Sequence, residues 1–441
     1  MRDIRNELVE MLRNEVKPAV GCTEPVALAL ACAKAKELLG EEVIDNKMLV
    51  SNNIFKNGMG VGIPGSKILG LKVAACMGIV GGKSADGLSV LEGLTEEEVR
   101  ESEKYLEEHT ISVEPTDSAD KIYLEVILKG ANHEVLVKIR GRHDNFTYLA
   151  KDGEVILDNE PKEVSATETS ATETSATEER KETLMDNATV AEIVDNVEKM
   201  DFEDIKFLLD GITMNRAMAE VGLREKTGVG TGFGIKEAIK AGELGDDLVN
   251  YAMMLTSAAS DARMSGVKMP VMSSNGSGNH GLTAILPIAA YNERNPQSDE
   301  RVARALAISH LITAYIKNFT GRLSPMCGCG VAAAIGCTAG LSWLMDAEQS
   351  QIEGAMENMI ANLSGMICDG AKPGCACKLA TASSAAVQNA ILAKRGCIVP
   401  GLNGIVGRSV DESVRALGCV GDEGMSVTDN VILDVMNEMN K

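Results

Sequence analysis

Two parts of different pattern meet at Ser165-Ala-Thr-Glu-Thr-Ser-Ala-Thr-Glu-Thr-Ser-Ala-Thr-Glu-Glu179 in this chain of 441 residues. The tract repeats small and polar residues, and it has no bulky apolar side chain that could offset the entropy of ordering. We therefore interpret residues 165–180 as a low-complexity, flexible tether. The tether separates an N-terminal domain, residues 1–164, from a C-terminal domain, residues 181–441.

The N-terminal part has the pattern of an α+β domain, a mixed α/β unit with an antiparallel sheet. Two helical stretches, at about 3–14 and 24–39, precede a strand at 47–53. Turn residues then separate further short runs of alternating apolar residues, which is typical of consecutive β-strands. These runs lie at 110–114, 121–129, 133–140, 145–151 and 155–157.

The C-terminal part is dominated by helical periodicity, which predicts an all-α domain whose helices are interrupted by glycine-rich loops. Runs of alanine and serine within these helices favour close packing. Because loops held by a rigid scaffold commonly carry function, we expect the site in those glycine loops.

Composition excludes several classes of protein. A formal net charge of −21 argues against a nucleic-acid partner, which would need a basic face. No apolar run reaches membrane-spanning length, and the charged start lacks the apolar core of a signal peptide. We therefore expect a cytoplasmic protein with no membrane partner and a small-molecule substrate. The sequence is compatible with a homo-oligomer.

Five of the eleven cysteines fall in two glycine-rich segments that each open onto a predicted helix. The segments are Met326-Cys327-Gly-Cys329-Gly330 and Cys368-Asp-Gly-Ala-Lys-Pro-Gly-Cys375-Ala-Cys377. Eleven cysteines in a chain of this length do not form a disulfide framework. Thiolates near helix N-termini and free backbone N–H groups suit an iron–sulfur cluster. Zinc is the rival metal, but these intervals differ from its usual cysteine pairs.

A further cysteine lies at the start of a helix, in Val20-Gly-Cys22-Thr-Glu-Pro25. Thr23 suits an N-cap and Pro25 suits the first turn. The positive end of the helix then predicts a lowered pKa for the Cys22 thiol. Such a thiolate can act as a nucleophile, a general base or a metal ligand.

Two polar, glycine-rich loops complete the set of candidate segments. The first spans residues 51–65 and the second residues 273–281. Exposed N–H groups and amide side chains in such loops can hold a carboxylate. The candidate substrate-binding residues are Asn52, Asn53, Asn57, Asn275 and His280.

Taken together, these motifs resemble those of the L-cysteine desulfidases, relatives of the α-chain of iron–sulfur L-serine dehydratases. The resemblance is carried by residues 18–25, 57–65, 273–281, 326–330 and 368–375, and it covers the chain apart from the Ser/Ala/Thr/Glu tract. It implies a [4Fe–4S] cluster held by three cysteines. It also implies β-elimination from L-cysteine, a carbon–sulfur lyase activity that yields pyruvate, ammonia and hydrogen sulfide.

The resemblance implies that Cys368, Cys375 and Cys327 hold the cluster, with Cys329 as the alternative to Cys327. Cys22 matches the cysteine that takes the α-proton of the substrate, while a cluster iron binds the substrate thiolate. Three alternatives remain open at this point. They are an L-serine dehydratase on the same scaffold, a non-catalytic iron–sulfur redox sensor and a zinc-stabilised interaction module.

Overall fold

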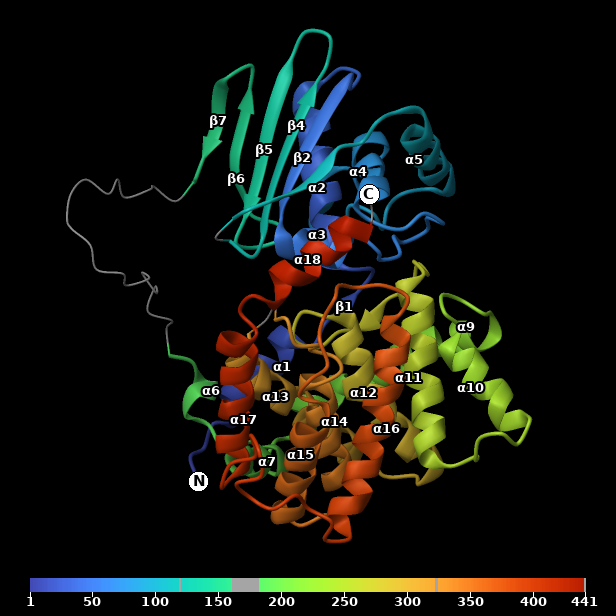
Figure 1. Ribbon diagram of the computed structural model, residues 1–441, viewed down its shortest axis with the longest axis vertical. Coiled ribbons are helices and arrows are strands. Elements are labelled where there is room, and N and C mark those ends of the chain that lie inside the picture. The colour runs from blue at the N-terminus through green and yellow to red at the C-terminus, as the bar shows by residue number, and fades with distance from the viewer. Residues whose placement is uncertain (119, 161–181, 322–323, 440–441) are drawn as a thin grey trace, which may run out of the picture.

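The structure is a computed structural model that describes residues 1–118, 120–160, 182–321 and 324–439. Figure 1 shows a sheet with its helices above a larger group of helices, so the α+β prediction is confirmed. The predicted tether at residues 165–180 lies outside the described residues. The division into domains at 164 and 181 therefore stays a prediction.

The sheet has six strands in the order β3-β2-β4-β5-β6-β7. Their bounds are β2 (Asp45–Ser51), β3 (Val113–Thr116), β4 (Tyr123–Lys129), β5 (Glu134–Arg140), β6 (Phe146–Lys151) and β7 (Glu154–Asp158). All neighbours pair antiparallel except β2 and β3, which are parallel. This pair differs from the predicted antiparallel arrangement, because three helices connect the two strands and return the chain in the same direction.

Alternation of apolar residues buries one face of this sheet. On β4, for example, Leu124, Val126 and Leu128 are fully buried. Helix α2 (Thr23–Leu39) packs on β4 and β5, and α4 (Leu71–Val80) packs on α2. The connection between β2 and β3 also contains α3 (Asn52–Gly58), a 3₁₀ turn (Ser84–Ser89) and α5 (Glu96–Glu108).

The helical part is built around α13 and α14, which pack along one another, and α11, which packs on α9 and α16. Close packing follows from small residues: a Cβ on Gly336 of α14 would lie 2.4 Å from the carbonyl oxygen of Ser309. The helices of this part are α6 (Leu184–Asn187), α7 (Val190–Glu198), α8 (Phe202–Ile205), a 3₁₀ turn (Lys206–Leu209), α9 (Asp210–Arg224), α10 (Thr231–Lys240), α11 (Leu248–Met264), α12 (Gly278–Arg294), α13 (Asp299–Thr320), α14 (Ala332–Leu344), α15 (Gln349–Leu363), α16 (Cys375–Lys394), α17 (Val410–Cys419) and a π-helical turn (Val420–Gly424).

Both ends of the chain cross between the two parts (Figure 1). Helix α1 (Arg5–Glu15) packs on α7 and α13, and β1 (Pro18–Ala19) pairs with β8 (Val271–Met272) of the helical part. Helix α18 (Thr428–Met439) returns to contact α3. This exchange places the start of α2 against the helical part, which positions the site.

Across the described ranges, none of the helices has both the length and the apolar character that a membrane span requires.

Candidate functional site

One cavity of about 240 Å³ lies where the two parts meet. Segments distant in sequence supply its wall: the start of α2, helix α3, the end of α11, the start of α12 and both cysteine segments. The predicted residues that line it are Cys22, Asn53, Asn57, Asn275, His280, Cys327, Cys329, Cys368 and Cys375. The structure thus brings together nine of the ten candidates that the sequence singled out.

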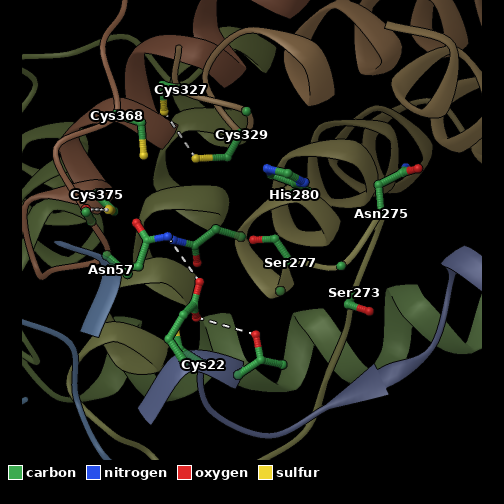
Figure 2. Close-up of a pocket in the computed structure, with 18 of the residues that line it drawn as sticks. Cys22, Asn57, Ser273, Asn275, Ser277, His280, Cys327, Cys329, Cys368 and Cys375 are labelled. Carbon is green, nitrogen blue, oxygen red and sulfur yellow. Dashed lines mark hydrogen bonds between the residues drawn. The ribbon is translucent and has the colours of Figure 1, made fainter. Parts of the chain in front are cut away.

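The two cysteine segments are held side by side by backbone hydrogen bonds. The N–H of Cys327 donates to the carbonyl of Met366 (2.8 Å), and the N–H of Cys368 donates to the carbonyl of Pro325 (2.6 Å). Figure 2 shows the side chains of Cys327, Cys329, Cys368 and Cys375 around one space. The sulfurs of Cys327 and Cys329 are 3.5 Å apart. Exposed Cys377, by contrast, lies outside this wall and contacts the Thr231 hydroxyl.

These four thiols disturb one another's ionisation. A hydrogen bond from Cys329 lowers the pKa of Cys327 to about 7, and the same bond raises the pKa of Cys329. Burial raises the pKa of Cys368 and raises that of Cys375 to about 12, and the neighbouring sulfurs add to both effects. Crowded, buried thiols ionise together only beside added positive charge, which bound iron would provide.

Glycines let the chain fold tightly around this space. A Cβ on Gly330 would lie 2.2 Å from the sulfur of Met366 and 3.3 Å from that of Cys327. Gly370 has a φ of +90°, and its Cβ would lie 2.1 Å from the carbonyl oxygen of Lys56. Thiol donors in a glycine-lined space fit a thiolate-held iron–sulfur cluster. In the described part of the chain, no three His, Cys, Asp or Glu side chains meet closely enough to hold one metal ion.

Three helices direct their N-termini at the cavity. Cys22 is the N-cap of α2, Ser277 is the N-cap of α12, and Cys375 is the first residue of α16. The first N–H groups of a helix have no partner within the helix, and its dipole places partial positive charge there. The cavity is therefore suited to thiolates and to an anionic ligand such as a carboxylate.

Cys22 is partly buried and contacts a buried guanidinium. Arg263 Nη2 lies 3.4 Å from Cys22 Sγ and donates to the carbonyl of Gly21 (2.8 Å). Burial raises the pKa of the Cys22 thiol; Arg263 opposes this and Glu24 adds to it. The predicted lowering of this pKa is therefore wrong, because desolvation by burial outweighs the effect of Arg263. The N-cap is also Cys22 itself, one residue before the predicted Thr23.

The candidate asparagines take different positions. Asn53 and Asn57 lie on α3, so the predicted strand end and loop are helical here, and Asn57 donates to Glu24 Oε1 (3.1 Å). Asn52 lies outside the cavity wall and donates to Asp117 Oδ1 (3.5 Å). Figure 2 shows the amide of Asn275 pointing away from the cysteines.

Hydrogen bonds explain the direction of Asn275. Its Nδ2 donates to the hydroxyl of Ser274 (2.9 Å) and to the carbonyl of His310 (3.4 Å). Asn275 therefore fixes the loop and contributes backbone to the cavity. His280 belongs to the first turn of α12 instead of a loop, and burial lowers its pKa to about 3, so its imidazole is neutral.

Sequence reasoning missed the charged residues of the wall. Arg263 lies within a buried stretch of α11, Lys56 is buried on α3 and pairs with Asp429 of α18, and Lys378 pairs with Asp369. A buried cation is costly without a partner, so an arginine or lysine within an otherwise apolar helix was the available signal. The partners of Arg263 and Lys56 are too distant in sequence to be identified from spacing.

The family described as the serine dehydratase alpha chain matches residues 85–434. A UPF0597 protein of Clostridioides difficile (strain 630) is 66% identical over 433 residues, which cover 98% of this chain and 100% of the relative. A UPF0597 protein of Alkaliphilus oremlandii (strain OhILAs) is 47% identical over 438 residues, with 99% of each chain covered. One from Clostridium tetani (strain Massachusetts / E88) is 44% identical over 429 residues, with 97% of each chain covered.

Proposed function

This chain belongs to the serine dehydratase alpha chain family, and from that premise we propose that it is a lyase that eliminates the β-substituent of an L-amino acid. The substrate that we propose is L-cysteine, with pyruvate, ammonia and hydrogen sulfide as products. The observation that carries the proposal is the gathering of four cysteines from two segments opposite a fifth, Cys22, in one cavity.

The cofactor that we propose is a [4Fe–4S] cluster held by Cys368, Cys375 and Cys327. Cys327 is preferred over Cys329, because its separation from Cys368 is closer to the interval in the dehydratases that the sequence resembles. When bound, such a cluster supplies an iron that acts as a Lewis acid and stabilises the charge of the leaving sulfur. Three ligands leave one iron of the four open for this purpose.

The residues around the cluster site orient the substrate and move its proton. The N–H groups at the start of α12, beside Ser277, have no partner within the helix and suit the α-carboxylate. Asn57 and Asn53 offer amide groups from the opposite wall. Cys22 Sγ, as a thiolate, takes the α-proton and holds it while the β-thiol leaves. The resulting aminoacrylate hydrolyses to pyruvate and ammonia.

L-serine is the second candidate substrate, because the family that matches 350 of the 441 residues is described as a serine dehydratase chain. The two reactions differ only in the leaving atom, sulfur or oxygen. Soft sulfur binds iron of a cluster well, whereas a hydroxyl depends more on the Lewis acidity of that iron.

The test uses protein reconstituted with iron and sulfide without oxygen. L-cysteine and L-serine are supplied separately, and pyruvate and sulfide are measured. We expect equal amounts of pyruvate and sulfide from L-cysteine. Pyruvate from L-serine but not from L-cysteine would mean that L-serine is the substrate. An intact cluster with no pyruvate from either amino acid would favour a non-catalytic redox sensor.

A variant pair tests the role of Cys22. Cys22→Ser should retain the cluster and lose elimination by about 100-fold or more, as expected when a general base is removed. Cys419→Ser is the matched control, because Cys419 is exposed at the end of α17, and it should react as the wild type does. Near-normal turnover in Cys22→Ser would exclude Cys22 as the base.

A further inference from the structure

Within the described residues, the buried guanidinium of Arg263 has no carboxylate among its hydrogen-bond partners. Its side chain lies at the end of α11 and is 6% exposed. Its hydrogen bonds go to the carbonyl of Gly21 (2.8 Å), the amide oxygen of Asn279 (3.1 Å) and the thiol of Cys22 (3.4 Å). Burying a guanidinium in this way is costly unless an anion balances its charge.

The fold holds this guanidinium in place. A Cβ on Gly278 would lie 2.4 Å from Arg263 Nε and 2.6 Å from its Cζ, so only glycine lets the group lie flat against the start of α12. Among the residues that the structure describes, Nε has no hydrogen-bond partner. The guanidinium thus bridges the start of α2 and the start of α12 and faces the cavity between them.

A charge of opposite sign acts on the same sulfur. Glu24 lies two residues after Cys22 and accepts a hydrogen bond from Asn57 Nδ2 (3.1 Å). Glu24 and Arg263 act on Cys22, and Lys56, Lys317 and Lys378 line the cavity from α3, α13 and α16. Glu24 also acts on the buried imidazole of His143.

We propose that Arg263 is a positioning residue that serves as the counterion of the Cys22 thiolate, and that Glu24 opposes it. When the Cys22 thiol ionises, its thiolate balances the charge of the buried guanidinium, and the hydrogen bond from Arg263 to the carbonyl of Gly21 holds the two groups together. Arg263 does not itself take the proton. This proposal rests on the proposed function in one respect, namely that Cys22 takes part in the reaction.

The effects of the two charged groups on the pKa of Cys22 agree with this arrangement. Burial raises the pKa of the thiol, Arg263 lowers it, and Glu24 raises it. Removing Arg263 should therefore raise the pKa further and reduce the thiolate at neutral pH. Removing the charge of Glu24 should act in the opposite direction.

The experiment measures alkylation of Cys22 by iodoacetamide against pH, with the modified peptides quantified by mass spectrometry. It needs no substrate and no turnover, so it can succeed or fail separately from the proposed lyase activity. Arg263→Gln should raise the pH midpoint for Cys22 by about one unit, which lowers its rate near neutral pH about tenfold. The exposed thiol of Cys419 in the same sample should keep its rate.

Two variants separate the charge from a structural role. Arg263→Lys keeps the charge and should restore most of the rate, whereas Asn279→Ala removes a neutral partner of the guanidinium and should leave the midpoint in place. Equal midpoints in the wild type and a folded Arg263→Gln would overturn the proposal. If Arg263→Gln does not fold, Glu24→Gln tests the proposal in its place. A lower pH midpoint for alkylation of Cys22 in Glu24→Gln supports the proposal that the two charges oppose each other at Cys22, and an unchanged midpoint overturns it.

Discussion

Gly370 lies between the ligand candidates Cys368 and Cys375, and its replacement by alanine should disrupt the cluster site. Its φ of +90° is a conformation that residues with a Cβ rarely adopt. The added Cβ would also lie 2.1 Å from the carbonyl oxygen of Lys56, a backbone atom on α3 that cannot turn aside. The loop must therefore shift away from α3 and carry both cysteines with it.

The expected loss of stability follows from the strained backbone conformation and the steric overlap. A strained backbone conformation costs about 1–3 kcal/mol, and overpacking costs about 1–3 kcal/mol. We expect Gly370→Ala to lower the free energy of unfolding by about 4 kcal/mol. Unfolding entropy near about 2.1 cal/mol/K per residue for a chain of 441 residues converts this to a Tm lower by about 4 °C.

The assay combines thermal unfolding with iron analysis after anaerobic reconstitution. Gly365→Ala is the matched control, because nothing lies within 4 Å of a Cβ built at Gly365, and it should keep both its Tm and its iron. Gly370→Ala should lose most of its iron. A Gly370→Ala protein with the wild-type Tm and a full complement of iron would refute the claim that this loop is fixed by contact with α3.

Two further predictions concern the thiols and the pH dependence of stability. Cys368→Ala and Cys375→Ala should each lose the visible absorbance near roughly 400 nm that is expected of such clusters. Cys377→Ala removes an exposed thiol outside the cavity wall and should keep this absorbance. Absorbance retained in both ligand variants would contradict the assignment of Cys368 and Cys375 as ligands. Burial lowers the pKa of His310 to about 3 in the folded protein, whereas in the unfolded chain it is about 6.5. The neutral imidazole therefore contributes fully to the free energy of unfolding above about pH 6.5, and this contribution is lost as the pH falls toward 3. Between about pH 7 and pH 5, His310 lowers the free energy of unfolding by about 2 kcal/mol. In urea unfolding, His310→Asn should therefore lose about 2 kcal/mol less than the wild type over this pH range. Equal losses in the two proteins would mean that His310 is not buried in its neutral form.

The sequence predicted the fold class because its signals were local. Alternating residues such as Leu124 and Val126 and the turns between the hairpins identify strands β4 to β7. The parallel pairing of β2 with β3 was missed, because it depends on the packing of the helices between them. The end of β2 was placed two residues late, since Asn52 and Asn53 already begin α3.

The candidate site was predicted in part for the same reason. Glycine-flanked cysteines and helix starts are local motifs, and nine candidates line one cavity. The direction of the Asn275 amide depends on Ser274 and His310, which no spacing reveals. The pKa of Cys22 depends on burial by residues far away in the chain. Arg263 was missed because only the folded chain brings it to α2.

The most direct measurement is iron and sulfide analysis of protein that is purified without oxygen and then tested for lyase activity. We expect iron and acid-labile sulfide in equal amounts, visible colour, and pyruvate release only from the coloured protein. A colourless protein that contains zinc and no iron, and that takes up no iron on reconstitution, would contradict it.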